Sequence, residues 1–153
     1  MEKTRLRALF VIVIASVGPM MLGLDFLLRH FLIASQAADV RAFMAEHVTP
    51  IAWGVVPFPL LGGVVGFRWY PARFRKSLER WRRDSTITPD VAAERADLEA
   101  LFLTTTLAQL PAVLGDLSLI LGAHVAPALS STAVSVTAVI VISLFARERP
   151  RVR

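Results

Sequence analysis

Four long runs of apolar residues, separated by short polar segments, dominate the pattern of this chain. The runs predict membrane-spanning helices over residues 8–33, 50–70, 98–122 and 126–146. Each reaches the roughly 17–25 residues that an α-helix needs to cross the hydrocarbon core of a bilayer. Asp25 and Asp116 are the only charged residues in the apolar stretches of these runs, which are Ala8–Leu28, Pro50–Phe67, Ala100–Ala123 and Val125–Ala146. The pattern therefore predicts an all-α integral membrane bundle of four transmembrane helices, formed by residues 1–153 as a single domain.

The segment before the second run carries apolar residues at helical spacing. Val40, Phe43, Met44 and His47 follow the i, i+3, i+4, i+7 pattern. This spacing predicts a short amphipathic helix at the outer membrane surface. The dipeptide at residues 49–50, Thr-Pro, is expected to be the N-cap and first residue of the second span.

Residues 71–97 are expected to form a basic helical loop on the cytoplasmic side. Phe74, Leu78 and Trp81 make an apolar stripe among arginine and lysine residues, which favours a helix lying at the membrane surface. The alternative is that the second span continues past Pro71 as a tilted helix. The run Thr-Pro-Asp at residues 88–90 then predicts a new helix that extends from Pro89 to about residue 122.

The first and third spans show a weak internal repeat. Pro19 and Gly23 match Pro111 and Gly115 at the same offset of 92 residues. If the repeat is a duplication, the bundle consists of two tandem hairpins in parallel. Pro19 also predicts a kink near the middle of the first span.

Charge gives the expected orientation. Fifteen of the seventeen lysine and arginine residues lie at the two ends of the chain and in the middle loop, which by the positive-inside rule are cytoplasmic. We therefore expect a multi-pass protein of the cell membrane with its N- and C-termini in the cytoplasm. We also expect basic residues of the loop to contact anionic lipid head groups, and we expect no nucleic-acid partner. The lipid contacts are predicted for Arg73, Arg75, Lys76, Arg80, Arg82 and Arg83.

The first span could be confused with a cleaved signal peptide, because Ser-Gln-Ala at residues 35–37 resembles a cleavage site. Its apolar run exceeds the 7–15 residues of a signal-peptide core, and Asp25, Arg29 and His30 precede the site. We expect it to be retained.

Polar residues within the spans are the candidates for function, because they are expensive in hydrocarbon. Asp25, Gln109 and Asp116 lie inside the apolar runs, with Thr105 and Thr106 on the cytoplasmic side of Gln109. Asp25 could pair with Arg29, four residues later on the same helix face. Asp116 has no such basic neighbour. It either bonds to hydroxyl groups of the fourth span as a structural link, or it exchanges protons or cations.

No cofactor or metal is expected. The chain contains no cysteine, which excludes disulfides and thiol chemistry. His30, His47 and His124 all fall on the expected outer side, but no pair has the spacing of a helical metal motif, so they are only weak metal or haem candidates. No catalytic motif is present, and we expect no enzymatic activity.

The segment from Ala108 to Gly115, AQLPAVLG, resembles the carboxylate-bearing helix of rotary ATPase proteolipids, the c-type subunits, which often reads Ala-Glu-x-x-Ala-x-x-Gly. The resemblance implies a hairpin design and an ion-binding role for the residue that follows Ala108. In this chain Gln109 stands in place of the ion-carrying glutamate, and the cytoplasmic loop is far longer than in that family.

Two functions are therefore expected from the sequence. The first is a non-catalytic structural, assembly or accessory component of a membrane complex, with a membrane-protein partner or a second copy of itself. The alternative is a channel or carrier for protons or cations that uses Asp116 and Asp25.

Overall fold

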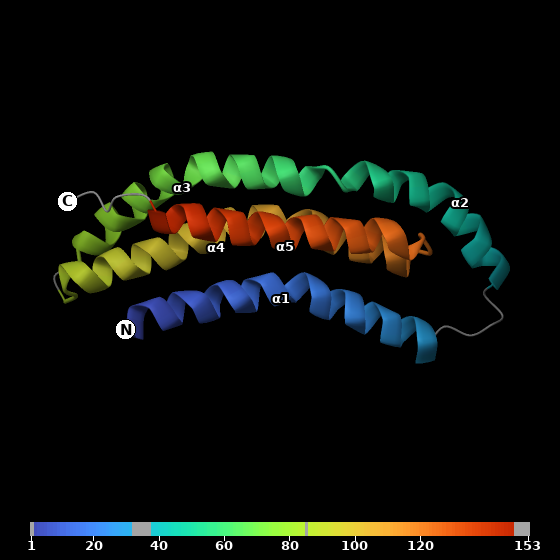
Figure 1. Ribbon diagram of the computed structural model, residues 1–153, viewed down its shortest axis with the longest axis horizontal. Helices are drawn as coiled ribbons and strands as arrows, with labels where there is room; N and C mark the ends of the chain where they lie inside the picture. The colour runs from blue at the N-terminus through green and yellow to red at the C-terminus, as the bar shows by residue number, and fades with distance from the viewer. Residues whose placement is uncertain (1, 32–37, 85, 149–153) are drawn as a thin grey trace.

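A computed structural model describes residues 2–31, 38–84 and 86–148, and all regular structure in these ranges is helical. The helices are α1 (Glu2–Phe31), α2 (Ala38–Val55), α3 (Phe58–Arg82), α4 (Pro89–Ile120) and α5 (Val125–Glu148) (Figure 1). Four segments are long and apolar enough to cross a membrane. They are Arg5–Leu28, Ala42–Arg82, Pro89–Ile120 and Val125–Ala146. The predicted all-α class with four candidate spans is confirmed.

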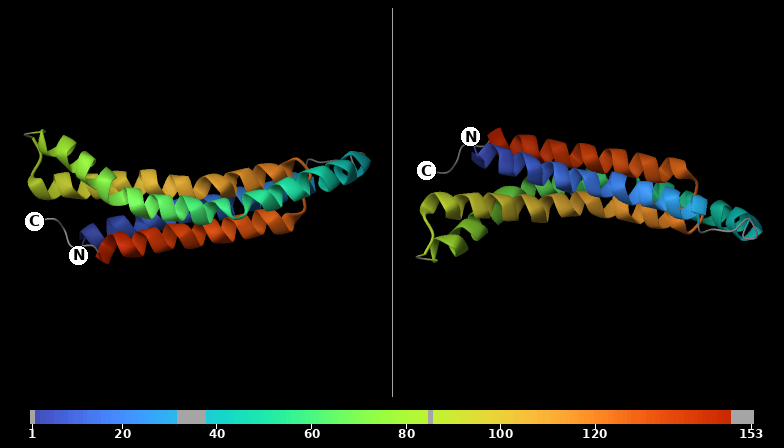
Figure 2. Two further views of the ribbon diagram at one scale, coloured as in Figure 1. Left: turned by 90° about the horizontal axis from the view of Figure 1, so that it is seen from above. Right: turned by 90° about the horizontal axis from the view of Figure 1, so that it is seen from below.

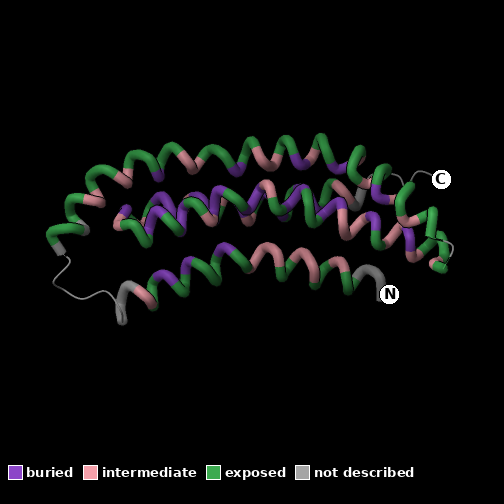
Figure 3. The backbone as a smooth tube through the Cα atoms, turned by 180° about the vertical axis from the view of Figure 1, so that it is seen from behind, coloured by how far each residue is buried: buried purple, intermediate pink, exposed green. Residues whose placement is uncertain are grey.

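The antiparallel helices α4 and α5 form the centre of the bundle. Helix α3 covers one side of this pair and packs along α4 most extensively, while α1 lies on the opposite side and contacts both α4 and α5 (Figures 1 and 2). Buried positions concentrate on α4 and α5, and most of α2 is exposed (Figure 3). The buried apolar residues of α4 and α5 include Leu101, Val139 and Ile142.

The tandem-hairpin arrangement is not what the structure has. Helices α1 and α3, which would form the first hairpin, lie on opposite sides of α4 and α5. The matched glycines also differ: a methyl group on Gly23 would meet nothing within 4 Å, whereas one on Gly115 would lie 3.1 Å from the Ser131 Cβ. The sequence match therefore does not correspond to equivalent packing.

The predicted helix start at residues 49–50 is wrong. Helix α2 runs through Pro50 to Val55, and the chain turns only at residues 56 and 57 before α3 begins. A single proline removes one backbone N–H donor from a helix, whereas Pro57 and Pro59 together remove two such donors within three residues, so two helical hydrogen bonds are lost in one turn. The break therefore falls at the paired prolines. The end of α2 leads into α3 along nearly the same line, and the start of α2 curves away from it (Figure 1).

The alternative interpretation of residues 71–97 is confirmed in its first part, because α3 continues through Pro71 as far as Arg82. The separate surface helix predicted there is therefore wrong. In the turn that follows, the carboxylate of Asp84 accepts hydrogen bonds from the Thr86 amide at 3.0 Å and the Thr86 hydroxyl at 2.6 Å. These bonds favour the ionised form and lower the pKa of Asp84 below its usual value.

Helix α4 begins at Pro89, as predicted, with Thr88 as an extended N-cap residue. Its other end closes through Gly122, whose φ of 111° favours glycine. The Ala123 amide donates to the Ser118 carbonyl at 2.9 Å, and the Gly122 amide donates to the Leu119 carbonyl at 3.1 Å. This is the Schellman pattern, which satisfies carbonyl groups that a helix end would otherwise leave open.

Two glycines one helical turn apart, Gly62 and Gly66, bring α3 against α4. A methyl group on Gly62 would lie 2.8 Å from the Leu107 carbonyl oxygen, and one on Gly66 would lie 2.8 Å from the Thr104 carbonyl oxygen. The spacing is that of the GxxxG packing motif. The Leu107 carbonyl has no amide partner four residues later, because residue 111 is proline. The backbone of Gly62 thus covers a carbonyl group that α4 leaves open.

Candidate functional site

Two carboxyl groups are buried in the half of the bundle near the α4–α5 turn. Asp25 of α1 is 2% exposed, and Asp116 of α4 is 1% exposed. The two groups are close enough for their charges to interact. They are brought together because α1 and α4 run in the same direction and contact each other along the bundle (Figure 1). Sequence reasoning named both residues, and the structure brings them to one helix interface.

The carboxyl group of Asp116 is buried without a bonded donor among the described residues. Neither of its carboxyl oxygens has a hydrogen-bond partner among the described residues. On α5, the hydroxyl groups of Thr132 and Ser135 are also buried without a partner in the described part of the chain. The expected bonds from fourth-span hydroxyls to Asp116 are therefore not formed. The nearby Ser131 hydroxyl instead donates to the Pro111 carbonyl at 2.8 Å.

Gln109 lies two helical turns from Asp116 and links α4 to α1. Its side-chain amide nitrogen donates to the Ile14 carbonyl at 3.2 Å, while its Oε1 has no partner among the described residues. A methyl group on Gly18 would lie 3.5 Å from that oxygen and 3.2 Å from the Thr132 Cγ2. Gly18 is thus the point where α1 comes close enough to bring Gln109 and Thr132 together. We call Asp25, Gln109, Asp116, Thr132 and Ser135 the polar seam.

The two candidate threonines do not extend this seam. The Thr105 hydroxyl is buried but donates to the Leu101 carbonyl of its own helix at 2.6 Å. Thr106 is exposed on another face, and its hydroxyl donates to the Phe102 carbonyl at 2.7 Å. Both hydroxyl groups are used within α4, which is a common way for threonine to satisfy itself in a helix.

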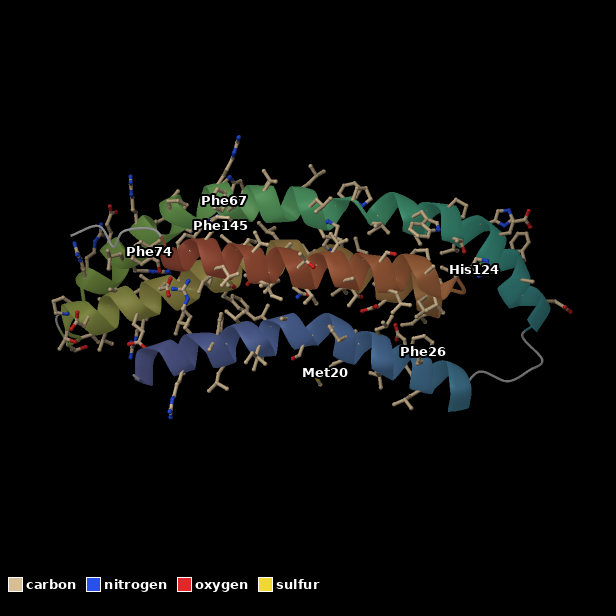
Figure 4. The ribbon with its side chains drawn as sticks, viewed as in Figure 1. Met20, Phe26, Phe67, Phe74, His124 and Phe145 are labelled. Carbon is tan, nitrogen blue, oxygen red and sulfur yellow. The ribbon has the colours of Figure 1, made fainter. Side chains whose placement is uncertain are left out.

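The histidines are not gathered into a site. His47 is exposed on α2, its Nδ1 lies 2.9 Å from the Phe43 carbonyl, and its ring is 4.3 Å from the Phe43 ring. His124 is exposed at the turn between α4 and α5 (Figure 4). The side chains of His30 and Arg29 lie outside the described residues, and so does the predicted Asp25–Arg29 pair. Where the structure describes side chains, no three His, Asp or Glu residues are grouped as a metal ion would need.

A second polar cluster, at the opposite end of the bundle, was not foreseen from the sequence. The Arg7 guanidinium lies 3.2 Å from the Asp97 carboxylate and donates to the Ser143 carbonyl at 3.2 Å. The Tyr70 hydroxyl also donates to Asp97. Asp97 of α4 is thus bonded to Arg7 of α1 and Tyr70 of α3, and Arg7 links it to the Ser143 carbonyl of α5. No local spacing in the sequence links Asp97 to Arg7 or Tyr70, because the three residues lie far apart in the chain.

Glu99 forms a further link between α3 and α4. Its carboxylate accepts bonds from the Ser77 hydroxyl, the Arg80 guanidinium and, at 3.1 Å, the Trp81 indole nitrogen. Of the six basic residues predicted to contact lipid, four line a groove beside this carboxylate, whereas Arg75 and Arg82 are exposed outside it. The four are Arg73, Lys76, Arg80 and Arg83.

The aromatic residues at this level pack between helices. The rings of Phe67 on α3 and Phe145 on α5 meet edge to face, with centroids 5.5 Å apart (Figure 4). Phe74 stacks on Tyr70 with centroids 6.2 Å apart.

Comparison of the chain with protein-family models, curated proteins and solved structures gave no match. The resemblance of residues 108–115 to rotary proteolipids therefore stays a resemblance of one helix.

Proposed function

We propose that this chain is a small membrane channel or carrier for protons or small cations, with Asp116, Asp25 and Gln109 as its working residues. One observation carries the proposal: the carboxyl group of Asp116 is buried among the helices and has no hydrogen-bond partner among the described residues. Ionisable groups inside membrane spans are rare and mark ion or proton pathways. A carboxyl group that only joined helices would be expected to have donors around it.

The chemistry of the polar seam supports the same class of ligand. The open positions belong to oxygen atoms of Asp116, Gln109, Thr132 and Ser135. Oxygen atoms are the ligands of hard cations, and a carboxyl group can itself take up a proton. Because these oxygens are distributed over about two helical turns, they favour a line of successive positions rather than one closed metal cage.

The depth of the two carboxyl groups also supports exchange. Asp116 precedes the end of α4 by four residues, which is about 6 Å at the rise of an α-helix. Asp25 precedes the end of α1 by six residues, or about 9 Å. With the expected orientation, both groups are within reach of the outer solution, and Gln109 lies further inward.

The test is ion flux in liposomes that contain the purified protein. We expect acidification of the lumen, followed with a trapped pH-sensitive dye under a potassium–valinomycin potential, and we expect Asp116→Asn and Asp25→Asn to abolish it. Asp90→Asn makes the same chemical change at an exposed position of α4 and should leave the flux unchanged. Parallel runs with a sodium-sensitive dye distinguish protons from cations. Flux that persists in Asp116→Asn would overturn the proposal.

A second candidate is a structural or accessory component of a membrane complex. The observation that favours it is that small residues, including Gly62, Gly66 and Ser131, lie where the helices contact each other closely. Chemical cross-linking in membranes, followed by mass spectrometry, tests it. A defined protein partner or a second copy of the chain, together with no flux in liposomes, would favour this function over transport.

A further inference from the structure

The C-terminal end of α3 and the facing part of α4 enclose a groove of about 440 Å³. This size falls within the range of small-molecule sites in proteins, about 300–1,000 Å³. Its wall on the α3 side carries Arg73, Lys76, Arg80 and Arg83. These residues follow a spacing of three and four, so they share one face of the helix. Ala100 and Leu103 of α4 form its apolar part.

The charge of the groove is only partly compensated. Its two carboxylates belong to Glu79 and Glu99, and Glu99 pairs with Arg80. Arg73, Lys76 and Arg83 form no ion pair with any described residue. Four cations against two carboxylates leave an excess of two positive charges, which suits a ligand that carries two negative charges.

The groove also continues into apolar surface. Leu103 of α4, which lines the groove, is 41% exposed. Trp69, one turn before Arg73 on α3, is 51% exposed, and the Arg73 guanidinium carbon lies 5.8 Å from its ring centroid. Exposed tryptophan beside basic residues is typical of the level where head groups meet hydrocarbon. A ligand in this groove would therefore have its anionic part at the cations and its apolar part along α4.

We propose that this groove is a binding site for a phospholipid whose head group carries two negative charges, held by Arg73, Lys76, Arg80 and Arg83. Basic pockets between transmembrane helices on the cytoplasmic side bind such head groups. The guanidinium groups of Arg73, Arg80 and Arg83 supply planar pairs of donors that match phosphate oxygens. Lys76 adds a compact charge between them. This inference is independent of ion transport by the polar seam.

Native mass spectrometry of the full chain, released from detergent with increasing amounts of lipid, tests the proposal. The probes are cardiolipin with two phosphates, phosphatidylglycerol with one, zwitterionic phosphatidylcholine, and glycerol phosphate without acyl chains. We expect the tightest binding for cardiolipin. Equal affinity for the one-phosphate and two-phosphate lipids would overturn the assignment of charge. Glycerol phosphate binding as tightly as the lipids would show a free-phosphate site instead.

Matched variants separate a built site from general attraction to anionic lipid. Lys76→Gln/Arg83→Gln removes two charges from the groove, and Arg75→Gln/Arg82→Gln removes two from exposed neighbours on α3. At roughly fivefold for each cation, the groove variant should weaken cardiolipin binding by about 25-fold, and the control by less than about threefold. Melting in detergent checks that both variants fold. An equal loss of binding in both would overturn the proposal.

Discussion

At Asp116, the stability of the fold and the proposed ion transport make opposite demands. Its carboxyl group is buried without a donor among the described residues, and such a group destabilises the fold by about 1–3 kcal/mol. We therefore predict that Asp116→Leu increases the free energy of unfolding while it abolishes ion flux. Reversible unfolding in mixed detergent micelles measures the first effect. A structural link would behave in the opposite way, with lower stability in the variant.

Asp97 provides the matched contrast on the same helix. Its carboxylate accepts bonds from Tyr70 and pairs with Arg7, so Asp97→Leu removes bonds to a charged group and leaves Arg7 without its carboxylate. Hydrogen bonds to charged groups contribute about 1.5–3 kcal/mol each, and we predict a loss of stability of this order. The same unfolding assay checks it. If both leucine variants shifted stability in the same direction, the different environments of the two carboxyl groups would not matter.

At the residue scale, the sequence identifies polar groups that are costly to bury in apolar runs, but it does not identify contacts between residues that lie far apart in the chain. Asp25, Gln109 and Asp116 could be predicted as site residues because each is a polar group in an apolar run. The cluster of Arg7, Asp97 and Tyr70 could not, because its members lie far apart in the chain and only the helix packing joins them. The bonds of Thr105 and Thr106 to their own helix depend on rotamers that a sequence does not specify.

Among the elements, the contact between α3 and α4 depends most on small residues. A methyl group on Gly62 would be forced within 2.8 Å of the Leu107 carbonyl oxygen. We predict that Gly62→Ala separates the helices and lowers stability by about 1–3 kcal/mol, as overpacking does. Gly54→Ala is the control, because a methyl group there would meet nothing within 4 Å. In a helix it should be neutral or raise stability by up to about 1 kcal/mol.

Unfolding of the two alanine variants in detergent tests this contact. Equal stabilities would mean that α3 can move away from α4 without loss of stability.

The residues that decide the outcome could be recognised in the sequence as a GxxxG spacing, but their partner helix could not. Likewise, the four runs predicted the helices, whereas a Thr-Pro pair predicted a helix start correctly at Pro89 and wrongly at Pro50. Helix α2 runs through Pro50 and α3 runs through Pro71, and the chain breaks only where Pro57 and Pro59 act together.

The whole molecule has two unlike ends. The start of α1, the end of α5 and the turn between α3 and α4 lie together at one end of the bundle, with the α4–α5 turn at the other (Figure 1). The first end carries most of the arginine and lysine residues, and the second carries the two buried carboxyl groups nearby. If the basic end faces the cytoplasm, the proposed lipid site and the proposed point of ion entry lie on opposite sides of the membrane.

Because the chain contains no cysteine, a single introduced cysteine reports its side without background. His124, in the α4–α5 turn, and Thr86, in the α3–α4 turn, are both exposed, and either can be replaced by cysteine at the surface. These two turns lie at opposite ends of the bundle (Figure 1). We predict that a membrane-impermeant maleimide labels His124→Cys in intact cells, because fifteen of the seventeen basic residues favour a cytoplasmic position for the other end. Thr86→Cys should react only after the membrane is permeabilised. The reverse labelling pattern would mean that the orientation in the membrane is inverted. The end with the polar seam would then face the cytoplasm, and the basic groove would face outward.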